Sequence, residues 1–135
     1  MPRAVRLVTV ADVAAPVDPG DLAVSARHEA VIDDGRRIVL LDGRGFTESL
    51  RGPGAGRVDV WTSTSEDDLA RTARVVVGPD EPYGDLTQAD MEAGHWATLA
   101  DVLRAQGVQV DADELRRLPH DVELTDALRA RLGGG

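Results

Sequence analysis

The sequence contains no cysteine, no lysine and no asparagine. Without cysteine the chain forms no disulfide, presents no thiolate nucleophile and offers no sulfur ligand to zinc or to an iron–sulfur cluster. We therefore expect no cofactor and no metal. All 15 basic residues are arginine, which is typical of GC-rich bacterial genomes and indicates a source rather than a function.

Long apolar runs are also missing. No stretch approaches the roughly 20 apolar residues of a membrane-spanning helix, and Met1-Pro2-Arg3 leads into a strand-like run rather than a signal peptide. We expect a cytoplasmic protein without membrane contact. Aromatic residues make up 3% of the chain, so we predict a core of valine and leucine. The few large anchors are Phe46, Trp61, Tyr83 and Trp96.

Basic residues are scarce in one stretch of the second half. The net charge is −9, and residues 1–58 hold eight acids and eight bases, so the excess charge lies beyond residue 58. Between Arg74 and Arg104 there is no base but six acids: Asp80, Glu81, Asp85, Asp90, Glu92 and Asp101. Such a field repels nucleic acid and attracts a basic protein surface or a cationic ligand. An acidic surface that simply maintains solubility remains the alternative.

Strand patterns dominate the first half of the sequence. The β-rich runs are residues 3–10, 24–32, 37–41 and 57–62. Asp33-Asp34-Gly35 joins the second and third runs and predicts a hairpin. Residues 42–45 predict a further turn, and the glycine-rich run 51–57 predicts a surface loop, because it lacks the features of a phosphate-binding loop.

Helix signals dominate the second half. Paired capping residues mark three helix starts: Ser65 with Asp68, Thr87 with Asp90, and Asp111 with Glu114. Residues 75–77 fit either the end of the first helix or a short buried strand. Leu124, Leu128 and Leu132 lie on one face of a predicted last helix.

The helix predicted over residues 87–106 organises the rest of the chain. Gly107 supplies its stop signal, and its apolar arc includes Trp96 and Leu99. Glu92 and His95 fall inside this arc, three positions apart. They are either a proton-transfer pair at a pocket edge or an exposed carboxylate and a histidine satisfied by a carbonyl.

The loop before this helix is the best candidate site in the sequence. It holds Asp80, Glu81, Tyr83 and Asp85 and leads into the helix that carries Glu92, His95 and Trp96. Its alternative is an ordinary connection whose acids complement the helix dipole. Two other histidines are weaker candidates: His28 shares a strand face with aliphatic residues, and His120 is adjacent to Asp121.

These observations predict a single α+β domain over residues 1–135. Residues 1–64 form a small antiparallel sheet, residues 65–132 form three or four helices that pack on it as a second layer, and residues 133–135 fray. For function, the leading hypothesis is a non-catalytic acidic interaction protein that binds a basic protein partner.

The alternative function is a small enzyme or small-molecule binder that uses Glu92 and His95 as catalytic residues. Its pocket lies at the start of the 87–106 helix, beside Tyr83 and the acidic loop, and takes a cationic or amine-bearing ligand. A mimic of duplex nucleic acid is a third reading, which needs acids at phosphate-like spacing.

Overall fold

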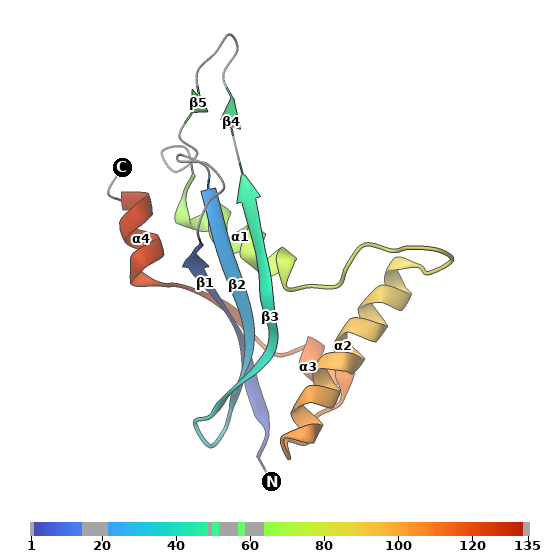
Figure 1. Cartoon of the computed structure of the whole chain (residues 1–135). Coiled ribbons are helices and arrows are strands. Elements are labelled where there is room, and N and C mark those ends of the chain that lie inside the picture. Colours follow the sequence, from blue (N-terminus) through green and yellow to red (C-terminus); the bar gives the residue numbers. More distant parts are fainter. Residues whose placement is uncertain (1, 15–21, 49, 52–56, 59–63, 134–135) are drawn as a thin grey trace.

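The computed structural model describes residues 2–14, 22–48, 50–51, 57–58 and 64–133. Its strands are β1 (Ala4–Val13), β2 (Leu22–Ile32), β3 (Arg37–Glu48), β4 (Leu50–Arg51), β5 (Arg57–Val58) and β6 (His120–Leu124). Its helices are α1 (Glu66–Val76), α2 (Gln88–Ala105), α3 (Ala112–Arg116) and α4 (Asp126–Gly133). The α+β class predicted from the sequence is confirmed (Figure 1).

Four strands form one mixed sheet in the order β3-β2-β1-β6. The pairs β1/β2 and β2/β3 are antiparallel, as predicted, and β6 pairs with β1 in parallel. The fourth strand is therefore a contribution from the otherwise helical second half. β4 and β5 pair with each other as a small separate sheet.

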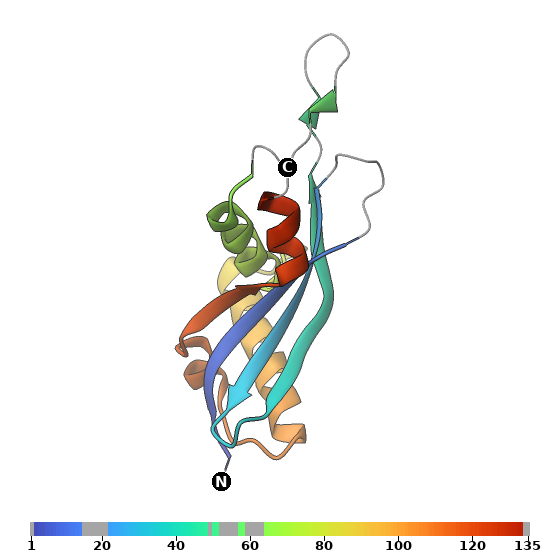
Figure 2. The ribbon, with the colours of Figure 1, turned by 90° about the vertical axis from the view of Figure 1, so that its left-hand side faces the viewer.

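The helices lie on one face of the four-stranded sheet, and the opposite face carries none of the described helices (Figure 2). Leu7, Thr9 and Ala11 share the helix-covered face, because side chains alternate along a strand. Two apolar clusters pack there. One joins Leu7 and Ile32 to α2 and α3, and the other joins Ala11 and Val24 to α1 and α4.

On the face of the sheet without helices, side chains form a network of ion pairs. Glu29 is only 6% exposed. Its carboxylate accepts a hydrogen bond from Arg27 Nε at 2.6 Å and forms an ion pair with Arg37 Nε at 2.8 Å. Arg37 also reaches Glu123 on the far strand at 3.0 Å. The arginine side chains thus satisfy a nearly buried carboxylate, which would be costly unpaired.

The central helix forms as predicted. Thr87 is the N-cap of α2, and its hydroxyl accepts a hydrogen bond from the Asp90 backbone while the Asp90 side chain accepts one from the Thr87 backbone. Gly107 adopts φ 83° just beyond the helix, where a residue with a Cβ is strained. Leu99 and Leu103 are buried on the side that faces the sheet.

Most local predictions are confirmed, and the structure assigns residues 75–77, which fitted either a helix end or a strand. The hairpin β2/β3, the capping box of α1 at Ser65 and the cap of α3 at Asp111 are all present. Residues 75 and 76 belong to α1, and Val77 is its C-cap. Within the described ranges, no helix is long and apolar enough to span a bilayer.

Three local predictions are wrong. Residues 42–45 lie inside β3, where Gly43 adopts φ 75° next to a register shift, instead of ending the strand. His120 and Leu124 lie in β6 rather than in a loop and a last helix. Pairing with β1 overrides their weak local preference. Residues 59–63, which include Trp61 and most of one predicted strand, lie outside the described residues.

Removing the N-cap of α2 tests how strongly this helix depends on its start. We expect Thr87→Ala to lower the free energy of unfolding by about 1 kcal/mol, because a backbone N–H loses its acceptor. Urea unfolding followed by circular dichroism measures the change. Thr98→Ala is the matched control, since Thr98 is exposed within α2 and bonds to the Gly94 carbonyl. An equal loss in both variants would contradict the capping role.

Candidate functional site

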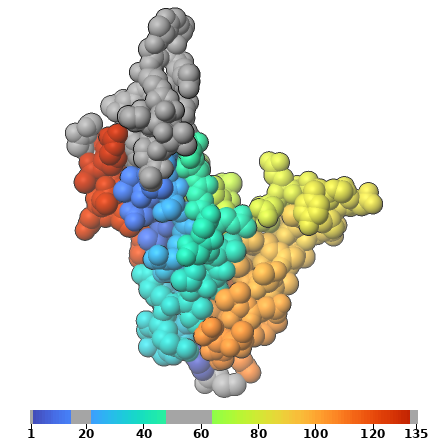
Figure 3. Space-filling view, in the orientation of Figure 1, coloured from blue at the N-terminus to red at the C-terminus, as the bar shows by residue number. Residues whose placement is uncertain are grey.

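The loop between α1 and α2 projects from the body of the protein (Figure 3). We call residues 79–86 the acidic arm. Every residue from Asp80 to Leu86 is exposed, with Tyr83 at 68% and Leu86 at 41%. Gly84 has φ 60°, and the Leu86 amide donates to the Tyr83 carbonyl at 3.1 Å. The arm is therefore a turn that presents an aromatic ring and a leucine to solvent.

One ion pair ties the acidic arm to the sheet. Arg44 Nη1 in β3 donates to Asp80 Oδ1 at 2.9 Å. Among the described residues, neither Glu81 nor Asp85 has an ion-pair partner. The arm therefore carries two carboxylates whose charge is not offset locally.

A pocket of about 400 Å³ lies where the acidic arm, α2 and β3 meet. We call it the arm pocket. It is lined by Leu41, Arg44, Asp80, Tyr83, Leu86, Asp90, Met91, Gly94, His95, Thr98 and Leu99. Three of the residues predicted from the sequence, Asp80, Tyr83 and His95, come together here at the start of the central helix.

Glu92 lines a different hollow from His95. It is exposed and lines a separate hollow of about 280 Å³ between α2 and α3, together with Trp96, Asp113 and Arg116. Within the described part of the chain, no hydrogen bond joins Glu92 to His95. Glu81 and Asp85 line neither hollow. Although the two residues are neighbours on α2, they line different hollows, and only His95 lines the arm pocket.

The surroundings of His95 favour its uncharged form. Burial lowers its pKa, and the nearby Arg44 cation lowers it further, while Asp80 and Glu92 act in the opposite direction. Its Nε2 is buried without a hydrogen-bond partner among the described residues. Its ring meets Trp96 edge to face, with the ring centroids 5.1 Å apart.

All three histidines of the chain gather near the centre of the helix-covered face. His28 stacks on His120 at 5.0 Å between centroids and meets the edge of Trp96 at 6.5 Å. Thr9 Oγ1 and His120 Nε2 share a hydrogen bond of 2.6 Å. We call His28, His95 and His120, together with Thr9 and Trp96, the histidine cluster. It separates the two apolar clusters of the core.

His28 is the most deeply buried member, at 1% exposure. Neither of its ring nitrogens has a hydrogen-bond partner in the described part of the chain. Burial lowers its pKa to about 3, and the neighbouring His120 and His95 contribute in the same direction. Sequence reasoning placed His28 on an aliphatic face but missed the cluster, because the three histidines are far apart along the chain.

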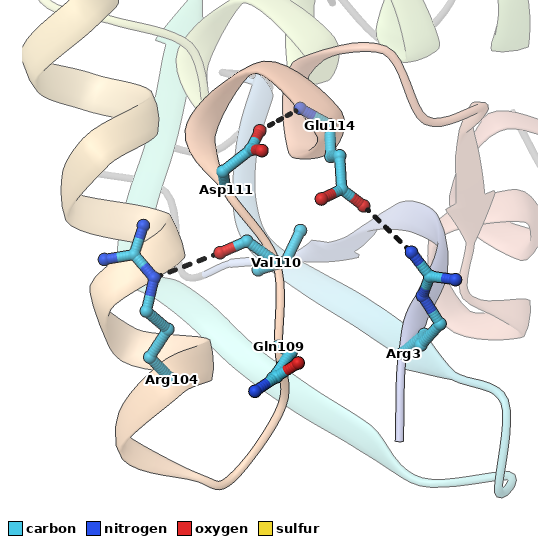
Figure 4. A pocket seen from close by; sticks show the side chains of 6 residues that line it. All are labelled: Arg3, Arg104, Gln109, Val110, Asp111 and Glu114. Carbon is cyan, nitrogen blue, oxygen red and sulfur yellow. Dashed lines mark hydrogen bonds and ion pairs between the residues drawn. The ribbon is translucent and has the colours of Figure 1, made fainter. Parts of the chain in front are cut away.

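A wider hollow of about 580 Å³ lies at the other end of α2 (Figure 4). Its two arginines are already engaged: Arg104 Nε donates to the Val110 carbonyl at 3.0 Å, and Arg3 lies 3.6 Å from Glu114. Arg3 is thus ion-paired within the wall, and Arg104 is ion-paired at 2.7 Å with Asp101, which does not line the hollow. Among the described residues, no group of three histidine, aspartate or glutamate side chains is arranged to hold a metal ion.

The fold and the sites thus define an α+β protein with an acidic projection, a pocket beneath it and a buried histidine cluster. Comparison with known proteins finds no family model, no curated protein and no solved structure that matches this chain. Any functional conclusion therefore depends on the chemistry of these sites.

Acid should destabilise the protein through the histidine cluster. Folded His28 has a pKa of about 3, whereas the unfolded chain binds this proton near the ordinary value of 6.5. Below that value the unfolded state binds more protons. We therefore expect the free energy of unfolding to fall as pH falls, by up to about 1.4 kcal/mol per pH unit from His28 alone.

Urea unfolding at a series of pH values from about 7 down to about 4 measures this slope. His28→Gln is the control variant, because glutamine is polar but does not titrate. Its slope should be smaller than that of the original protein, whatever its stability at neutral pH. His95 and His120 also have lowered pKa values, so some slope remains. Identical slopes in both proteins would show that His28 is not held neutral by the fold.

Proposed function

We propose that this protein is a non-catalytic interaction protein whose acidic arm docks onto a basic surface of a protein partner. The observation that carries the proposal is the arm itself. It holds an exposed aromatic ring and an exposed leucine away from the core, beside carboxylates whose charge no described residue offsets.

The apolar tip of the acidic arm supplies contact area. Tyr83 and Leu86 are among the most exposed large apolar side chains in the described ranges. Tyrosine is enriched among the residues that dominate binding energy at protein interfaces, because its ring is large and loses little conformational freedom. A partner that covers Tyr83 therefore removes apolar surface from water at one defined point.

The charges on the acidic arm select the partner. Glu81 and Asp85 flank the tyrosine, and the chain as a whole carries a net charge of −9. A field of this sign accelerates encounter with a basic surface and opposes an acidic one. Because these carboxylates are exposed, salt screens their effect. The partner is thus expected to present arginine or lysine around an apolar recess.

The arrangement of the reactive side chains favours binding over catalysis. Glu92 and His95 line different hollows, which argues against a shared role in catalysis. Thr9 and His120 have the spacing of a nucleophile and its base at 2.6 Å, but Thr9 is fully buried. A substrate would have to pass through the packed core to reach it.

Affinity capture from a lysate of the source cells tests the proposal. We expect a partner with a basic surface to be retained at low salt and released at high salt. Tyr83→Ala should weaken binding of the purified partner by about thirtyfold, which corresponds to about 2 kcal/mol for the loss of a central anchor. The double variant Glu81→Gln/Asp85→Asn should mainly slow association and flatten the salt dependence.

The double variant Asp67→Asn/Asp126→Asn is the matched control. It changes net charge by the same amount at exposed positions of α1 and α4, away from the acidic arm. It should bind the partner almost as well as the original protein does. Equal weakening by both double variants would mean that net charge alone attracts the partner. Retention unaffected by Tyr83→Ala would refute docking through the arm.

A further inference from the structure

We infer that the arm pocket is a binding site for a small primary amine with an aromatic or branched aliphatic body. This inference does not depend on docking of a protein partner. It is carried by the apolar surface of the pocket, by two carboxylates at its wall and by the sign of the local charge.

The apolar part of the pocket is built from three separate elements. Leu41 comes from β3, Leu86 from the acidic arm, and Met91 and Leu99 from α2. The volume of about 400 Å³ lies within the range of small-molecule sites. A ring or branched chain that enters this space is removed from water, at about 25 cal/mol for each Å² of apolar surface buried.

Two carboxylates in the wall each have an oxygen to offer. Asp80 Oδ1 accepts a hydrogen bond from Arg44 at 2.9 Å, and Asp90 Oδ2 accepts one from the Thr87 backbone at 2.9 Å. In the described part of the chain, the second oxygen of each carboxylate has no partner. An ammonium group carries three N–H donors and no acceptor, so it matches these oxygens.

The charges that line the pocket favour a cation. There are two carboxylates, Asp80 and Asp90, and one guanidinium, Arg44, so the lining carries a net charge of −1. His95 adds no positive charge near neutral pH, since burial lowers its pKa. Glu81 and Asp85 on the same arm strengthen the negative field. An anionic ligand would meet repulsion here, and Arg44 is already paired with Asp80.

Tyr83 adds a second attraction for an ammonium group at the wall of the pocket. Tyr83 lines the pocket from the acidic arm, while most of the residue stays exposed. An ammonium ion near an aromatic face is attracted by the negative charge density of the ring. A ligand with both an ammonium group and an apolar body therefore uses every type of surface that the pocket presents.

Titration of the full chain with 2-phenylethylamine tests the inference, with chemical shifts of the backbone amides as the readout. Two matched probes vary only the polar group: 2-phenylethanol is neutral and 3-phenylpropionate is anionic. We expect the amine to shift the amides of Met91, Gly94 and Thr98. Its Kd should be at least about tenfold lower than that of either probe. Added salt should weaken amine binding.

Gly94→Leu is the blocking variant. Gly94 lines the pocket, and a Cβ added there meets nothing within 4 Å, so a larger side chain fills the hollow without a backbone clash. Leucine also favours the helix over glycine by about 1 kcal/mol, so lost binding will not reflect unfolding. Ala97→Leu, at an exposed position of the same helix outside the pocket lining, is the control.

Loss of amine binding in Gly94→Leu, with binding retained in Ala97→Leu, would support the inference. Equal binding of the three probes would overturn the ammonium preference. The site itself would be refuted if Gly94→Leu bound the amine like the original protein, or if saturating amine left the pocket amides unshifted. None of these variants alters Glu81, Tyr83 or Asp85, so partner docking is judged separately.

Discussion

The parallel pairing of β6 with β1 is the constraint on which the rest of the structure depends. It runs from Leu7 opposite His120 to Ala11 opposite Leu124, and backbone hydrogen bonds to Pro119 and Thr125 extend it at both ends. A parallel pair needs a long crossover connection. The segment from α1 to α3 lies within the connection between β1 and β6. This segment therefore crosses one face of the sheet. The same pairing brings His120 beside Thr9.

The position of the histidine cluster follows from this pairing and divides the core into two parts. Thr9, His28 and His120 occupy the middle of the covered face, while aliphatic side chains occupy both ends of it. Burial keeps these imidazoles neutral, because a charged ring loses its hydration there. The fold therefore accommodates these polar rings in its interior in their neutral form.

The acidic arm joins α1 to α2, and the positions of the arm and of the arm pocket depend on how the arm is fixed at its two ends. The capping box at Thr87 and Asp90 begins α2 at a defined residue, and Arg44 anchors the arm to β3 through Asp80. Between these two points the backbone is exposed, so its side chains are available to other molecules. An apolar surface next to carboxylates is the chemical feature shared by the proposed partner site and the proposed amine site.

The sequence alone determined the local features that depend on contacts between residues close together in the chain. The hairpin turn and the caps at Ser65, Thr87 and Asp111 depend on residues within a few positions of one another. It also indicated a site at the start of the central helix with Tyr83 and His95. Tertiary structure alone decided that Glu92 and His95 line different hollows, that residues 120–124 form a strand and that three distant histidines meet. These features depend on pairing between β1 and β6 and on how α2 is rotated against the sheet. Such contacts join residues far apart in the chain, so no local pattern encodes them.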